Sequence, residues 1–117
     1  MEQERRQHNR FRLDNTLLIS SEGVYQLTDI SEGGFCFKCP PNTTILDRWF
    51  TDIINPIIPL VDCQVKKIWV TIHKDGEISM PTLMYIGAEF TGLKKELKIK
   101  LHELITELSQ KRRSQCC

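Results

Sequence analysis

The sequence predicts an all-β fold of six or seven short antiparallel strands, closed or nearly closed into a β-barrel, with one C-terminal helix over an opening. Up to Phe90, apolar and polar residues alternate with a period of two, in short runs separated by Gly, Pro, Asn and Asp. From Leu93 the apolar residues recur at helical spacing instead. At 117 residues, the chain is long enough for one hydrophobic core and too short for two.

The first strands are expected within residues 17–39. Residues 17–19 predict a short strand, and EGVYQLTDI predicts another, in which alternate residues share one face. That face would carry Val24, Gln26, Thr28 and Ile30. Gly33 and Gly34 interrupt the pattern, and FCFKC resumes it with residues 35, 37 and 39 on one side.

The later strands follow a double proline at 40–41, which ends the preceding strand. NTTILD predicts a loop, and RWFTDII predicts the next strand. VDCQVKKIWVTI predicts a long strand with residues 68, 70 and 72 on one face and Trp69 and Thr71 on the other. KDG at 74–76 favours a hairpin turn, because Asp-Gly tolerates positive φ angles. PTLMYIGAEF returns, with Met84, Ile86, Ala88 and Phe90 aligned.

The last element is an amphipathic helix. Its apolar stripe comprises Leu93, Leu97, Leu101, Leu104, Ile105 and Leu108. Lys and Glu fill the other faces, and the basic run at 111–113 falls where cations favour the helix dipole. We interpret these charges as a solvated face and the apolar stripe as the surface that packs on the barrel.

The net charge is +1, but it is unevenly distributed. Residues 1–12 carry four arginines and two glutamates, and residues 94–113 carry seven basic and three acidic residues. Residues 13–93 carry five basic and ten acidic residues. An acidic body between basic ends is unsuited to general nucleic-acid binding, although it allows a local anion site.

The cysteines and the N-terminal segment indicate the cellular compartment. Five cysteines at positions 36, 39, 63, 116 and 117 form no regular framework, and MEQERRQHNR lacks the apolar segment of a secretory signal. No apolar run approaches the roughly 18 residues of a membrane span. We therefore expect a cytoplasmic protein without membrane insertion.

Catalysis and metal binding have no clear candidate residues. Cys36 and Cys39 form a C-x-x-C, but an alternating strand directs them to opposite faces, which suits neither zinc nor a redox pair. The three histidines are scattered over the arm, the hairpin and the helix. The expectation is a protein that is not an enzyme and carries no metal or cofactor.

Two short motifs predict a ligand site. In ERRQHNRF, Arg6 and Arg10 are four residues apart, and a guanidinium fits a phosphate or a guanine edge with paired hydrogen bonds. In DISEGG, the carboxylate of Asp29 can accept from guanine donors, the hydroxyl of Ser31 can donate to phosphate, and the glycines let backbone amides approach an anion. The two together suit a planar, anionic purine ligand.

In combination and order, these motifs resemble those of the PilZ domains, bacterial receptors for cyclic di-GMP. The family pattern R-x-x-x-R followed by [D/N]-x-S-x-x-G is matched by residues 6–10 and 29–34, and YIGAEFTGL resembles the family's last strand. The resemblance implies that Arg6 and Arg10 hold guanine edges and phosphates, and that Asp29, Ser31, Gly33 and Gly34 form the opposite wall. It also implies that Arg5, just before the first motif, favours an intercalated dimer of cyclic di-GMP.

From this we expect three segments: a flexible arginine-rich arm (1–12), a single PilZ-like domain (13–113) and a disordered tail (114–117). The ligand would order the arm, which then signals to an unidentified protein partner in motility, biofilm or secretion control, as the resemblance implies. Two alternatives remain open: a protein-binding adaptor with this fold that binds no cyclic di-GMP, and a small nucleic-acid-binding barrel.

Overall fold

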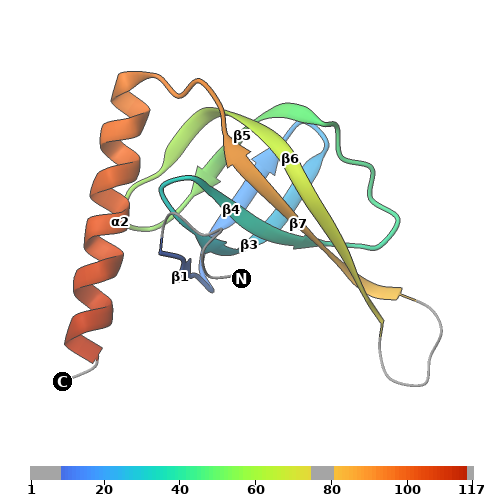
Figure 1. The fold of residues 1–117 in the computed structure, drawn as a ribbon, viewed down its shortest axis with the longest axis horizontal. Coiled ribbons are helices and arrows are strands. Elements are labelled where there is room, and N and C mark those ends of the chain that lie inside the picture. Colours follow the sequence, from blue (N-terminus) through green and yellow to red (C-terminus); the bar gives the residue numbers. More distant parts are fainter. Residues whose placement is uncertain (1–8, 75–80, 116–117) are drawn as a thin grey trace, which may run out of the picture.

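The computed structural model describes the backbone of residues 9–74 and 81–115. Seven strands are followed by one helix (Figure 1). The elements are β1 (Phe11–Arg12), β2 (Leu17–Ser20), β3 (Gly23–Ile30), β4 (Gly34–Cys39), β5 (Arg48–Ile54), β6 (Leu60–Lys74), β7 (Pro81–Phe90) and α2 (Lys95–Gln115). The predicted β-barrel with a C-terminal helix is confirmed.

Six antiparallel strands close the barrel in the order β3-β2-β5-β6-β7-β4, with β4 returning to β3. The short β1 lies outside this ring and pairs with the end of β3. It continues the line of β2 along one edge of β3, because the amide of Leu13 donates to the carbonyl of Thr28 (2.9 Å) and that of Leu27 to the carbonyl of Thr16 (3.0 Å). The end of the arm is therefore joined to the barrel as a strand.

The core fills the inside of the ring with aliphatic and aromatic side chains. Phe37 is fully buried, and its ring lies 5.5 Å from that of Tyr25 and 6.1 Å from that of Trp49. Residues 35, 37 and 39 all join this core, as the alternation in FCFKC predicts. The aligned residues Met84, Ile86 and Ala88 join it from β7.

The prediction that Val24, Gln26, Thr28 and Ile30 share one face was wrong. Val24 is 58% exposed, whereas Leu27 and Ile30 are both fully buried although they are three residues apart. A β-bulge between Leu27 and Asp29 reverses the alternation at this point. Asp29 therefore has its side chain outside the barrel, directly before the core residue Ile30.

The β6–β7 hairpin is confirmed, and it extends as a two-stranded ribbon beyond the rest of the barrel (Figure 1). Lys74 pairs with Pro81, and the predicted turn residues Asp75 and Gly76 lie outside the described residues. A second bulge, between Lys67 and Trp69, shifts the register of the ribbon. Beyond it, Ile68, Val70 and Ile72 are about half exposed rather than covered.

The helix packs its leucine stripe onto the barrel, with Leu101 and Leu104 buried and Leu97, Ile105 and Leu108 partly buried. Leu93 packs there too, although it precedes the helix. α2 ends at Gln115, two residues into the predicted tail, and Cys116 and Cys117 lie outside the described residues. Over the part of the chain described, α2 is not apolar enough to cross a membrane.

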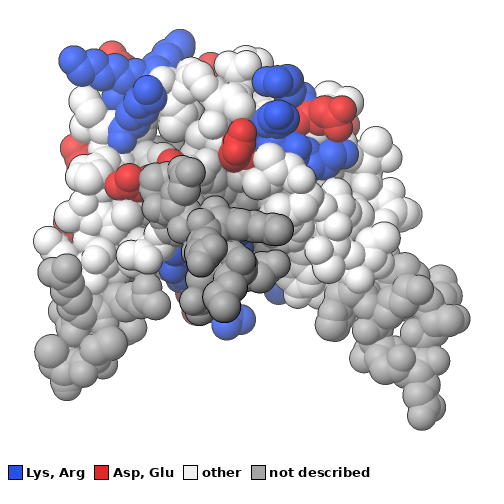
Figure 2. Space-filling view, viewed as in Figure 1, with Lys and Arg blue, Asp and Glu red and all other residues white. Residues whose placement is uncertain are grey.

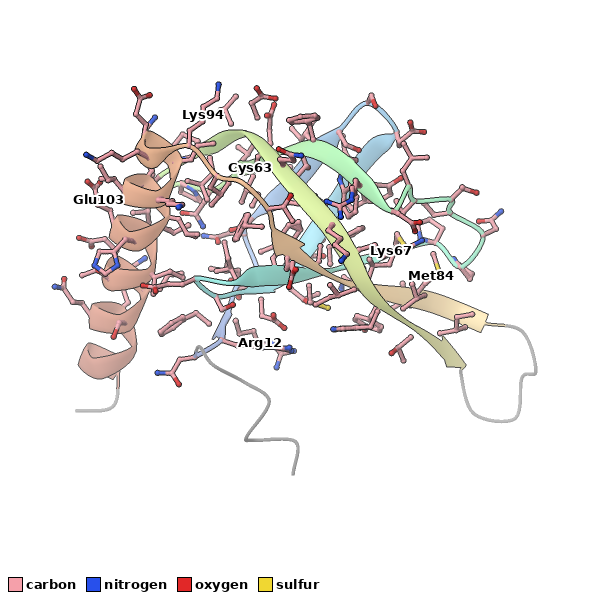
Figure 3. The ribbon with its side chains drawn as sticks, turned by 45° about the horizontal axis from the view of Figure 1, so that its top comes forward. Arg12, Cys63, Lys67, Met84, Lys94 and Glu103 are labelled. Carbon is pink, nitrogen blue, oxygen red and sulfur yellow. The ribbon has the colours of Figure 1, made fainter. Side chains whose placement is uncertain are left out.

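Cys63, on β6, is a buried thiol of this core (Figure 3). Burial raises its pKa from 9.0 to about 12, and the carboxylates of Asp52 and Asp62 add to the effect. Because the folded-state pKa is raised, its contribution to stability is complete below pH 9 and disappears as the pH rises toward 12.

We expect the free energy of unfolding of the wild type to fall between pH 8 and roughly pH 10.5 by about 2 kcal/mol more than that of Cys63→Ala. Urea unfolding at the two pH values measures the difference. Parallel pH profiles for the two proteins would contradict this account of Cys63.

Candidate ligand site on the barrel wall

The two predicted motifs meet where β1 joins β3. Phe11 pairs with Ile30, and both face the core, whereas Arg12 pairs with Asp29, and both face outward. Arg10, immediately before β1, is exposed on the same side of the barrel. The strand pairing therefore holds the end of the arginine motif beside the first residue of D-x-S-x-x-G.

A cavity of about 530 Å³ opens on the outer wall at this point. We call it the wall cavity; it is lined by Arg10, Arg12, Thr28, Asp29, Cys36, Lys38, Trp69, Thr71 and Tyr85. Four strands supply its floor in direct register, because Asp29 pairs with Cys36, Cys36 with Gly87, and Gly87 with Trp69. The floor is therefore a continuous piece of sheet.

The charges and rings of the wall cavity suit an anion that carries flat rings. Arg10, Arg12 and Lys38 bring three cations against the single carboxylate of Asp29. Trp69 and Tyr85 add aromatic surface, on which a base can stack. Guanidinium groups both pair with phosphates and stack on planar rings.

The indole ring of Trp69 lies so close to Gly87 that a Cβ at position 87 would collide with it. The sequence patterns place Trp69 on one face of a strand without assigning it to a site, and they do not indicate Arg12, Lys38 or Tyr85 as site residues. The available signal was Gly87, because a glycine inside a strand often marks close approach of another group. Trp49, by contrast, is buried in the core.

Ser31, Gly33 and Gly34 do not line the wall cavity among the described residues; they shape the turn that follows Asp29. The hydroxyl of Ser31 accepts hydrogen bonds from the amides of Gly33 and Gly34, both at 3.3 Å. The carbonyl of Gly33 accepts from the amide of Phe90 (3.0 Å), which ties the turn to β7.

Gly34 is required by packing. It begins β4 opposite Glu89, and a Cβ there would collide with the carbonyl oxygen of Ala88. Its φ is not in the positive range, so the need for glycine comes from the closeness of β7 rather than from a left-handed backbone conformation.

The pKa of Cys36 depends on its burial and on neighbouring groups of the wall cavity. Burial raises the pKa of its thiol, the carboxylate of Asp29 raises it further, and the Thr28 hydroxyl and Arg10 guanidinium act in the opposite direction. Thr28 also donates to the Cys36 carbonyl at 3.0 Å, which fixes the bulge. Cys39 belongs instead to the core, so the C-x-x-C is divided between the two faces. No group of three metal-ligating side chains occurs among the residues described.

Arg5 and Arg6 lie outside the described residues. Of the predicted site residues, the structure brings together Arg10 and Asp29 at the wall cavity, with Ser31, Gly33 and Gly34 supporting the adjacent turn. Arg10 and Arg12 also border a second cavity of about 410 Å³ on the other side of β1, toward Leu108 and Lys111 of α2. Figure 3 labels Arg12 at this end of the barrel.

Comparison with known proteins identifies the fold. The sequence matches no protein-family model and no curated protein sequence. The structure is similar to the "PilZ domain with c-di-GMP of YcgR from Escherichia coli", with a TM-score of 0.71 and 16% identity over 96% of this chain and 97% of that one. The MrkH–c-di-GMP complex of K. pneumonia gives a TM-score of 0.76 and 15% identity over 95% of this chain and 55% of that chain.

A second Escherichia coli structure, YcgR in complex with c-di-GMP, gives a TM-score of 0.73 and 13% identity over 96% of this chain and 49% of that chain. The present chain therefore spans about half the length of the MrkH chain and of this YcgR chain. The similarity extends over the barrel and the helix alike. The chain has the fold of a PilZ domain.

Proposed function

We propose that the protein is a receptor for cyclic di-GMP, which binds in the wall cavity. The observation that carries the proposal is the position of Arg10 and Asp29. They come from two separate sequence motifs, and they line one cavity together with Arg12, Lys38 and Trp69. Solved structures with the same fold, from YcgR and MrkH, are described as complexes with c-di-GMP.

Different residues of the wall cavity suit different chemical groups of cyclic di-GMP. Arg10, Arg12 and Lys38 offset the charge of the two phosphates, with Arg10 also able to reach a guanine edge through its paired donors. The carboxylate of Asp29 accepts hydrogen bonds from guanine N–H groups. The rings of Trp69 and Tyr85 stack with a base.

Arg5 and Arg6 are the remaining ligand-binding residues in this proposal. Arg6 binds the same ligand as Arg10, and Arg5 supplies a guanidinium to a second, intercalated cyclic di-GMP. Titration calorimetry with cyclic di-GMP tests both statements, and cyclic di-AMP serves as the control because adenine lacks the O6 acceptor and N2 donor of guanine. A stoichiometry near two supports the role of Arg5, and a stoichiometry near one removes it. Absence of heat favours the adaptor alternative.

In this proposal, the N-terminal arm (residues 1–12) transmits the signal to a protein partner. Four arginines within residues 1–12 repel one another, and a dianionic ligand that bridges them to the barrel would hold the arm across the wall and present it to a protein partner. We expect saturating cyclic di-GMP to slow amide hydrogen exchange in residues 4–12, while exchange in the core strand β5 is unchanged. Equal exchange of residues 4–12 with and without ligand would refute this mechanism but not ligand binding.

A further inference from the structure

One edge of β6 is open along the distal half of the strand. β5 pairs with β6 only as far as Lys66, which lies opposite Arg48, and one further hydrogen bond joins the amide of Lys67 to the carbonyl of Asp47 (2.7 Å). Beyond that point, no strand in residues 9–74 or 81–115 pairs with this edge, whereas the other edge pairs with β7 as far as Lys74. We call residues 68–72 along this edge the β6 edge.

The β6 edge carries an apolar stripe. Ile68, Val70 and Ile72 are 50%, 44% and 52% exposed. Natural proteins protect edge strands by keeping them short or by placing Lys, Pro or inward-facing charges on them. β6 is 15 residues long, and residues 68–72 contain no Pro and no charged side chain, so the bulge between Lys67 and Trp69 is the protective feature of this stretch. An open edge of this length, with alternating apolar side chains, is the template that strand addition requires.

Cations gather at one end of the β6 edge. Arg48 and Lys66 lie directly opposite each other, and Lys67 follows, with its ammonium 3.6 Å from Asp47 and 3.0 Å from the carbonyl of Ile45. In Figure 2, blue side chains with red ones beside them lie over the upper part of β6 and β7, and the surface below them along the ribbon is largely white. An occupant with carboxylates at this end would complement the charge.

A second copy of the chain complements this edge poorly. In antiparallel pairing of two β6 edges about Val70, Lys74 of each copy would approach the position where Arg48 pairs with Lys66 of the other copy, and like charges brought together destabilise a strand pair. The charge pattern therefore favours a partner of different sequence.

We propose that the β6 edge binds an extended segment of another protein as an added antiparallel strand. The segment alternates apolar residues with polar ones, and it carries carboxylates at its C-terminal end, which antiparallel pairing places beside Arg48 and Lys66. The proposal is independent of cyclic di-GMP, because the apolar stripe lies on the face of β6 opposite Trp69 and Thr71 of the wall cavity.

The test uses the full chain and a fluorescein-labelled peptide, Thr-Val-Thr-Val-Thr-Val-Glu-Glu, measured by fluorescence anisotropy. The control peptide has the same sequence with alternate backbone amides methylated, which removes the donors needed for strand pairing. We expect the first peptide to bind and the second not to bind. Backbone amide shifts in an NMR titration are expected to concentrate at residues 67–72.

Val70→Lys is expected to weaken peptide binding at least about tenfold, because it places a charge on the apolar stripe. The matched control is Val24→Lys on β3, which replaces another exposed valine (58% exposed, against 44% for Val70) elsewhere on the barrel and leaves binding unchanged. Circular dichroism establishes that both variants are folded. Equal binding by the two variants, equal binding of the two peptides, absence of binding, or a wild-type dimer in sedimentation that Val70→Lys dissociates would each overturn the proposal.

Discussion

Arg10→Ala is expected to lower the affinity for cyclic di-GMP by about 100-fold or more, with little change in stability. The guanidinium is exposed at the mouth of the wall cavity, so its loss creates no hole in the core. Its removal leaves a ligand phosphate or guanine edge without its charged partner, which typically costs about 2–5 kcal/mol or more in an interface. Titration calorimetry measures the affinity, and urea unfolding measures the stability.

Arg48→Ala is the matched control for this prediction. Arg48 is also an exposed arginine at a strand end, but it lies on β5 and lines none of the cavities described above. Its removal tests whether a loss of positive charge anywhere on the barrel weakens binding. If Arg48→Ala and Arg10→Ala weaken binding equally, general electrostatic attraction rather than a defined site accounts for the affinity.

Arg10→Lys separates charge from shape. Lysine keeps the positive charge but loses the planar fork of donors that pairs with a phosphate or a guanine edge. We expect Arg10→Lys to bind nearly as weakly as Arg10→Ala. Full recovery with lysine would mean that Arg10 contributes only charge.

The sequence was sufficient to predict the six barrel strands and the helix, because their periods differ and because proline and glycine mark several of their ends. It did not predict the two-residue strand β1. RWFTDII and PTLMYIGAEF coincide with β5 and β7. Sequence patterns were insufficient where the backbone departs from regular alternation. The bulge between Leu27 and Asp29 leaves no clear mark in the sequence, and it depends on pairing with β4, which lies beyond the turn.

The candidate site was predicted only as far as its local motifs extend. Arg10 and Asp29 each belong to a short pattern, and β1 brings them together. Trp69, Tyr85 and Lys38 reach the same cavity from three strands. Lys38 pairs with Tyr85 and Trp69 with Gly87, so only the register of the closed barrel brings these side chains to one cavity. Register depends on contacts between distant segments, so a reading of local patterns had no means to find these residues.

The structure also divides the second motif into residues with different tasks. Asp29 lines the wall cavity, Ser31 holds the turn through its hydroxyl, and Gly34 allows β4 and β7 to approach each other. Only the first of these tasks needs a ligand. An intact motif is therefore compatible with a structural role for two of these three residues, and variants at positions 10 and 34 should fail in different ways.

Gly34→Ala is expected to reduce the free energy of unfolding by roughly 2–4 kcal/mol. The new Cβ would collide with the carbonyl oxygen of Ala88 and lie 2.9 Å from Cα of Glu89, and both are backbone atoms that a side-chain rotation cannot move aside. The collision can be relieved only if β4 and β7 separate at the start of β4, beside the β3–β4 pairing that closes the barrel. Urea unfolding of the wild type and the variant measures the loss.

Ser31→Ala is the neighbouring control, because it removes the hydroxyl that accepts from the amides of Gly33 and Gly34 without adding an atom. Its expected cost is about 1 kcal/mol. Folded Gly34→Ala, studied at low temperature, should still bind cyclic di-GMP, because Gly34 does not line the wall cavity among the residues described there. Wild-type stability of Gly34→Ala would refute the packing role. Loss of binding by the folded variant would instead place Gly34 in contact with the ligand, and the motif could then no longer be divided in this way.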